Sequence, residues 1–335
     1  MHVGKSYKLT NFIYWTRRNI YVLLILGVAP VLLYHLAGFQ WLAIPWTVVA
    51  MLGTATAVIV GFKNSLTYSR TWNAGGIWTN IVNGSKAWAI LSRDFLHDPN
   101  TTRVLYNRHF AWLTALRFQL REDRIWEVTD NMANAEYQQY YAIPERETSM
   151  EAELVKYLPE EELGCVVGAH NKAAQILSLQ GLHVKALFDS QAILLPQFME
   201  MQKAINNLYA QQGQCESFKD TPYPRQYAIM NTILVRMFCF LLPFGLLHEF
   251  DKLNDTVSGV MKGYMVWLVI PFSVLISWLY TSLEQVGEST ENPFEGSPND
   301  VPISQISRAI EIEMRQMIGD GVLPAPLTPQ NDILV

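Results

Sequence analysis

Histidine side chains that could ligate a metal are present in the chain, but their spacing does not match a known metal-binding pattern. His97 and His109 form one candidate pair, and His170 and His183 form another. Neither pair has the i,i+4 spacing or the nearby carboxylate that a recognisable zinc site would show. We therefore interpret these histidines as core or surface residues and predict that the chain holds no metal.

The sequence also shows no pattern typical of a catalytic nucleophile or of a phosphate-binding loop. Cys165, Cys215 and Cys239 are odd in number, widely spaced and outside any CxxC pair, so we interpret them as ordinary thiols. The sequence contains no GxxxxGK[ST], GxGxxG, HExxH or GxSxG motif. We predict that the protein is not an enzyme and carries no cofactor.

The composition points to a membrane instead. Half of the 335 residues are hydrophobic and 16% are charged, whereas soluble domains have about 25% charged residues. The net charge of −5 is mild, and no basic run or aromatic-studded basic patch supports a nucleic-acid partner.

Four apolar runs are each long enough to cross a hydrocarbon layer of about 30 Å, which takes about 20 helical residues. They are residues 20–39, 41–60, 227–247 and 264–283. We expect an all-α membrane protein with two transmembrane hairpins. The alternative is that each run is a buried helix of a soluble core.

Basic residues predict how the hairpins are oriented. Lys5, Lys8, Arg17 and Arg18 precede the first run, Lys63 and Arg70 follow the second, and Arg225 precedes the third, whereas the connection between the third and fourth runs is net acidic. Both termini and the central block should therefore face the cytoplasm. The expected segments are a cytosolic N-terminal segment (1–19), a first hairpin (20–62), a helical cytosolic domain (63–225), a second hairpin (226–283), a cytosolic C-terminal segment (284–320) and a disordered tail (321–335).

Helical periodicity runs through the central block. One stripe contains Ile81, Ser85, Trp88 and Leu91, and a second contains Leu105, His109, Trp112 and Leu116. Gly181 and Pro196 are possible breaks in the long segment that follows. No alternating strand pattern stands out.

The second apolar run continues into a polar stretch without a turn residue. Thr54, Val58 and Phe62 are four residues apart and share one face of a helix. If several subunits placed this face around an axis, it would form a narrow apolar collar, and Lys63–Arg70 would continue the same helix into the cytosol. The alternative is that Val58 and Phe62 pack in the core of one subunit.

Several motifs, in order along nearly the whole chain, resemble those of the bestrophins and specifically of their bacterial homologues. They are "GFKNSLTYSRTWNAGGIW", "QCESFKDTPYP", "FLLPFGLL" and "ENPFEGSPNDVPIS". The resemblance implies a homopentameric ion channel in the bacterial inner membrane, with a pore lined by the second helix and monovalent ions passing a hydrophobic neck. The homopentamer, the lipid bilayer and the permeant ions are thus the expected partners.

The resemblance also implies roles for individual residues. The three neck positions match Thr54, Val58 and Phe62, of which Thr54 replaces a bulky apolar residue and Val58 is smaller than usual. The resemblance implies a second constriction at the cytosolic end, formed by one aliphatic residue near Ile193 to Leu195, and we assign it to Leu195. The remaining motif residues are Gly61, Arg70, Trp72, Pro243, Phe244, Pro293, Phe294, Asp300 and Pro302.

Two further expectations concern ions. Animal members bind Ca²⁺ after the PF motif, but here Glu295 and Asp300 offer too few carboxylates for the six to eight oxygen ligands of that ion. We therefore expect no tight Ca²⁺ site. Closeness to the bacterial branch favours cations such as Na⁺ slightly over Cl⁻. The competing hypothesis is a membrane-anchored scaffold or sensor whose helical domain binds a partner.

Overall fold

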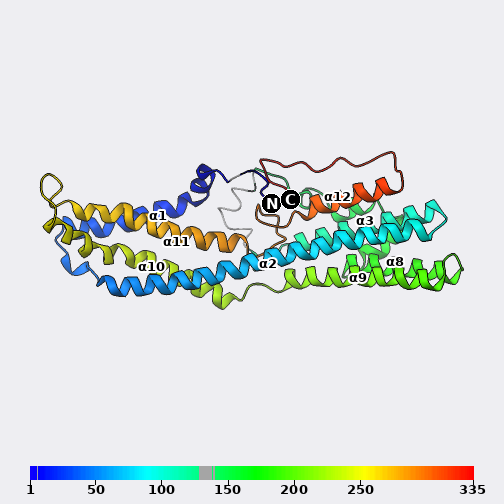
Figure 1. Ribbon diagram of the computed structural model, residues 1–335, viewed down its shortest axis with the longest axis horizontal. Helices are drawn as coiled ribbons and strands as arrows, with labels where there is room; N and C mark the ends of the chain where they lie inside the picture. Colours follow the sequence, from blue (N-terminus) through cyan, green and yellow to red (C-terminus); the bar gives the residue numbers. More distant parts are fainter. Residues whose placement is uncertain (6, 128–137, 139) are drawn as a thin grey trace. The chain divides into compact units, whose positions relative to one another are not determined.

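The computed structural model describes residues 1–5, 7–127, 138 and 140–335 (Figure 1). The chain divides into two compact units. The first, called the membrane unit here, comprises residues 5–69 and 223–291. The second, called the extramembrane unit, comprises residues 1–4, 70–222 and 292–335.

The membrane unit is built from long apolar helices. They are α1 (Leu9–His35), the first half of α2 (Trp46–Phe95), α10 (Arg225–Asp251) and α11 (Val269–Ser289). Short 3-10 turns accompany them at Gln40–Leu42, Lys252–Asp255 and Met265–Leu268. Four helical segments are long and apolar enough to cross a membrane, as the four apolar runs predict.

Small residues allow these helices to approach closely. A Cβ atom added at Gly245 of α10 would lie 2.7 Å from Val49 of α2, and one added at Gly53 of α2 would lie 2.7 Å from the Phe238 ring. The Tyr280 hydroxyl of α11 donates to the Gly53 carbonyl at 3.2 Å. Glycine at these positions lets the backbones pack directly, a common device where lipid supplies no hydrophobic driving force between helices.

The extramembrane unit is also helical. Beyond the second half of α2 it contains α3 (Pro99–Arg121), α5 (Pro144–Glu147), α6 (Met150–Leu154), α7 (Glu160–Val167), α8 (Lys172–Asp189), α9 (Leu195–Asp220) and α12 (Ile303–Met317). The described residues contain no β-strand, only isolated bridges. The all-α expectation is therefore confirmed for the part of the chain that the structure describes.

Local sequence signals explain where these helices begin. The Asp98 side chain accepts hydrogen bonds from the backbone amides of Asn100 and Thr101, both at 3.1 Å, with Pro99 at the first helical position. This satisfies amides that have no partner within the helix. Pro196 likewise stands in the first turn of α9. The expected break at Pro196 is confirmed, but the one at Gly181 is wrong, because α8 runs through it.

The predicted stripes of the central block form the core of the extramembrane unit. Ile81, Ser85 and Trp88 of α2 are buried, and Leu91 is partly buried against the same core. The four positions of the α3 stripe are all buried. The Trp112 indole donates to the Gln212 side chain of α9 at 2.9 Å. Burying a tryptophan with its N–H satisfied gains apolar area without a polar penalty.

The two chain ends lie side by side in the extramembrane unit (Figure 1). The Leu334 amide donates to the Met1 carbonyl at 2.8 Å, and Ile333 is buried against Tyr141 and Ile143. The expectation of a disordered tail is therefore wrong for these last residues. The proline-rich sequence of the tail predicted disorder, but the buried Ile333 side chain and backbone hydrogen bonds hold its end.

Candidate functional site

Helix α2 has two faces in the membrane unit, and they differ in burial. The buried positions are Val49, Gly53, Thr56, Val60, Lys63 and Thr67. Their spacing of three or four residues is that of one helical stripe. This stripe packs against α10 through Val49 and Gly53, and the Thr67 hydroxyl contacts that of Thr290, just after α11, at 3.0 Å. The packing leaves the opposite face of α2 open.

The three predicted neck residues all lie on this open face. Thr54 is exposed, Val58 is 52% exposed and Phe62 is 67% exposed within the single chain. The interpretation of Val58 and Phe62 as core residues of one subunit is therefore wrong. Large apolar side chains left exposed in register along one helix indicate a surface that contacts something else.

The basic residues after the second span are turned away from the open face. Lys63 is 2% exposed and lies within electrostatic reach of Glu288 on α11. The exposed positions of α2 between Met51 and Ser69 are all uncharged. The open face is therefore apolar to weakly polar, and the Lys63 charge does not lie on it.

Arg70 connects elements within the extramembrane unit. Its guanidinium donates to the carbonyls of Phe218 and Thr221 at 3.2 and 2.8 Å, at the C-terminal end of α9. It also lies 5.4 Å from the centre of the Phe218 ring. A cation at carbonyls of a helix C-terminus is electrostatically favourable. Arg70 thus has a structural role in this chain.

The guessed second constriction falls at the turn between α8 and α9. Leu195 is the first residue of α9 and is 56% exposed, and Leu194 before it is exposed as well, whereas Ile193 is buried. Gln191 in this turn has a positive φ of 59°. Leu194 and Leu195 are therefore the two residues of the guessed segment with free apolar surface.

The remaining motif residues occupy separate places. In the membrane unit, Pro243 and Phe244 lie in α10 and pack in its core, and Gly61 lies on the exposed side of α2. In the extramembrane unit, Trp72 is exposed on α2, and Pro302 immediately precedes α12. The motifs thus mark several structural positions and not one shared site.

The PF motif forms a tight loop in the extramembrane unit. Phe294 is buried in the core, and the Val301 amide donates to the Pro293 carbonyl at 3.1 Å. The buried Asp300 carboxylate accepts at Oδ2 from the amides of Gly296 and Ser297, at 2.7 and 2.9 Å, and at Oδ1 from the Ser297 hydroxyl at 2.6 Å. Since these donors already use its oxygens, Asp300 acts as an internal cap of the loop. The described residues contain no group of three or more metal-ligating side chains.

Arg121 joins α3 to the PF loop and to Glu145, a role that the sequence motifs do not predict. It is buried at the end of α3, donates to the Phe294 carbonyl at 2.7 Å, and lies 3.7 Å from the Glu145 carboxylate. Arg117, one turn earlier, binds the same carboxylate at 2.5 Å. The available signal was the i,i+4 spacing of Arg117 and Arg121 in the last turns of the helix, next to the apolar stripe that ends at Leu116.

The chain is similar to known proteins over most of its length. A sequence model described as "Bacterial/Fungal Bestrophin protein" matches residues 16–316. The voltage-dependent anion channel-forming protein YneE of Escherichia coli K12 is 27% identical over 301 residues, covering 89% of this chain and 85% of that protein. YneE of Salmonella typhi is 26% identical over 308 residues, covering 91% and 87%.

Solved structures have the same fold. A crystal structure of a bacterial bestrophin homologue from Klebsiella pneumoniae superposes with a TM-score of 0.73 at 23% identity, covering 92% of this chain and 99% of that chain. A second crystal structure, of a point variant of a membrane protein, gives a TM-score of 0.75 at 22% identity, covering 93% and 100%. Because the family's sequence model spans most of the chain, including α2 and the PF loop, this protein belongs to the bacterial and fungal bestrophin family.

Proposed function

We propose that this protein is a homopentameric ion channel of the bacterial inner membrane, with both termini cytoplasmic. The observation that carries the proposal is the open face of α2. In one chain it exposes Thr54, Val58 and Phe62, while the opposite face is packed against α10 and α11. Five copies of such a face around an axis would enclose a narrow apolar neck.

The chemistry of this neck suits a gate. Apolar constrictions close by losing water and open by dilation, because an ion cannot shed its hydration shell where no side chain replaces it. Val58 and Phe62 offer no such ligands. They would therefore act as gate residues, with Thr54 giving the outer end some polarity.

For the permeant ion we propose a small monovalent anion such as Cl⁻, in place of the Na⁺ expected from the sequence. The relatives at 26 to 27% identity are named anion channel-forming proteins. The open face between Met51 and Ser69 carries no charge of either sign, so it does not itself select between an anion and a cation. The proposed anion selectivity therefore rests on the names of these relatives.

The test is current through the purified protein in planar bilayers under an asymmetric NaCl gradient. We expect single-channel currents that reverse near the Cl⁻ Nernst potential. Reversal near the Na⁺ potential would contradict the proposed anion selectivity but not the channel. Silence from inserted, oligomeric protein would contradict the channel itself and favour the scaffold or sensor.

A variant pair tests whether α2 lines the pore. Phe62→Ala removes the apolar ring from the proposed neck, so we expect conductance to rise about twofold or more, because a wider neck is easier to wet. Phe240→Ala is the matched control, since Phe240 is also an exposed phenylalanine of the membrane unit but lies on α10. Equal conductance of Phe62→Ala and wild type would argue against the proposed neck.

A further inference from the structure

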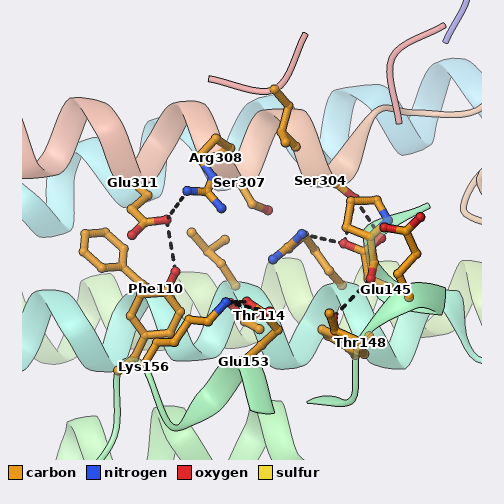
Figure 2. Close-up of a pocket in the computed structure, with 17 residues that line it drawn as sticks. Phe110, Thr114, Glu145, Thr148, Glu153, Lys156, Ser304, Ser307, Arg308 and Glu311 are labelled. Carbon is orange, nitrogen blue, oxygen red and sulfur yellow. Dashed lines mark hydrogen bonds and ion pairs between the residues drawn. The ribbon is translucent and has the colours of Figure 1, made fainter. Parts of the chain in front are cut away.

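A cavity of about 150 Å³ lies within the extramembrane unit (Figure 2). Its walls come from α3, the segment from α5 to Tyr157, and α12, and Leu327 of the C-terminal segment lines it as well. Charged, hydroxyl and apolar side chains all contribute to the wall. The charged groups decide what the cavity can bind.

Glu145 is the most deeply buried carboxylate of the wall, and it is fully partnered. Arg117 Nη1 donates to one oxygen at 2.5 Å, and the Ser304 hydroxyl lies 2.7 and 2.8 Å from the two oxygens. The Arg121 guanidinium lies behind it at 3.7 Å. A carboxylate with this many donors has little capacity left to bind a cationic ligand.

Two other carboxylates of the wall are likewise engaged. Glu311 accepts from the Tyr157 hydroxyl at 3.1 Å and from the Arg315 guanidinium at 3.0 Å. Glu153 receives both its hydrogen bonds from the Lys156 ammonium, at 2.6 and 2.7 Å. The fourth carboxylate of the wall, Glu147, is exposed to solvent.

The arginine side chains of the wall, in contrast, have hydrogen-bond donors without an acceptor in the part of the chain that the structure describes. Arg117 Nε is buried and has no hydrogen-bond partner among the described residues. Arg308 makes, within the same part of the chain, only one ion pair, at 3.8 Å to Glu311, and no hydrogen bond. A buried N–H without an acceptor is costly, so an oxygen ligand that reached Arg117 would relieve a penalty already present.

The net charge of the wall does not select the ligand, because three cationic side chains line the cavity against four carboxylates. What favours an anion is that three of these carboxylates are engaged or buried, whereas Arg117 and Arg308 keep donors without acceptors among the residues that the structure describes. Guanidinium groups match carboxylate geometry with two parallel hydrogen bonds. The excess donors therefore favour an oxyanion with two oxygens in one plane.

Apolar side chains form the rest of the wall. Phe110, Leu113, Pro144 and Leu327 offer carbon surface beside the arginines. A cavity of this volume is about the size of one that accepts benzene. We propose that this cavity is a binding site for a small organic carboxylate, held by Arg117 and Arg308 with its carbon body against the apolar wall.

The test is isothermal titration calorimetry on the full-length protein in detergent, with sodium benzoate as the probe. Benzamide has the same shape without the charge, and sodium phosphate is an anion without the carbon body. We expect benzoate to bind at least about tenfold more tightly than either, because a charge-assisted hydrogen bond contributes this much or more. No benzoate binding up to about 10 mM, equal binding of benzamide, or preferential binding of phosphate would each overturn the proposal.

Variants locate the binding. Arg308→Gln removes a half-buried cation and should weaken benzoate binding about tenfold or more, and Leu327→Glu should weaken it similarly by placing a carboxylate at the wall. Arg93→Gln is the matched control, because Arg93 is an exposed, paired arginine of the same unit outside the cavity. Unchanged binding in Arg308→Gln would contradict the proposal. Calorimetry needs no ion conduction, so its outcome is independent of the proposed channel.

Discussion

At the residue scale, burial of the His109 imidazole lowers its affinity for a proton. Its Nε2 lies 2.9 Å from the Ser85 hydroxyl, which itself donates to the Ile81 carbonyl, so His109 Nε2–H is the donor between them. Its Nδ1 is buried without a partner among the described residues. Adding a proton there would create an N–H without an acceptor, and burial accordingly lowers the pKa of His109 to about 3.

This pKa predicts an acid-sensitive fold. The unfolded histidine has a pKa near 6.5 and the folded one near 3, so as the pH falls below 6.5 the unfolded chain binds a proton that the folded chain does not. The contribution of His109 to the free energy of unfolding is fully present above pH 6.5 and is lost progressively between pH 6.5 and 3. At pH 5 the loss is about 2 kcal/mol. We expect His109→Gln to reduce the loss of stability between pH 7 and pH 5, measured as the apparent Tm in detergent.

The control for this prediction is a histidine in the same unit with an exposed position. His97 follows α2 and is exposed, so His97→Gln should leave the pH dependence unchanged. Identical pH profiles for wild type and His109→Gln would show that His109 is not the group responsible.

At the scale of elements, the register of α2 is the central fact. Its buried stripe includes Gly53, Lys63 and Thr67, and its open stripe includes Val58 and Phe62. Because successive positions on a helix are about 100° apart, packing one stripe against α10 and α11 fixes where the other points. The close approach at Gly245 of α10 holds this register.

The helix contact at Gly245 can be tested by overfilling it. A side chain at Gly245 would collide with Val49 of α2, so Gly245→Leu should destabilise the membrane unit by about 1–3 kcal/mol and lower the apparent Tm by several degrees. Gly76→Leu is the matched control, since no atom lies within 4 Å of a Cβ added at Gly76 of the same α2 helix. Both measurements use thermal unfolding in detergent. Equal Tm values for the two variants would mean that the α2–α10 contact is not tight.

At the scale of the whole molecule, the open face of α2 predicts assembly. A single chain leaves Val58 and Phe62 more than half exposed, and one copy alone cannot enclose a neck. The family resemblance supplies the number of copies.

Native mass spectrometry of the purified protein in mild detergent tests the assembly. We expect a mass of five times the 38.2 kDa chain. A stable monomer or dimer under conditions that preserve activity would contradict a pore around a fivefold axis, because too few α2 helices would be present to close it.

Features that depend on local pattern can be predicted from the amino-acid sequence. Length, periodicity and backbone chemistry predict the four apolar runs of membrane-spanning length, the helical stripes around Trp88 and Trp112, and the break at Pro196, which stands in the first turn of α9. The structure has all of them. The motif order was sufficient to identify the family.

The face that each helix buries, and the distant groups that come into contact, depend on how the helices pack together. Periodicity placed Val58 and Phe62 on one stripe but left both faces of α2 possible, and the contacts with α10 and α11 chose between them. The burial of Lys63 beside Glu288 and the meeting of Arg117 with Glu145 join residues far apart in the chain. Such pairings depend on how whole helices pack, and a sequence pattern that repeats every few residues carries no information about them.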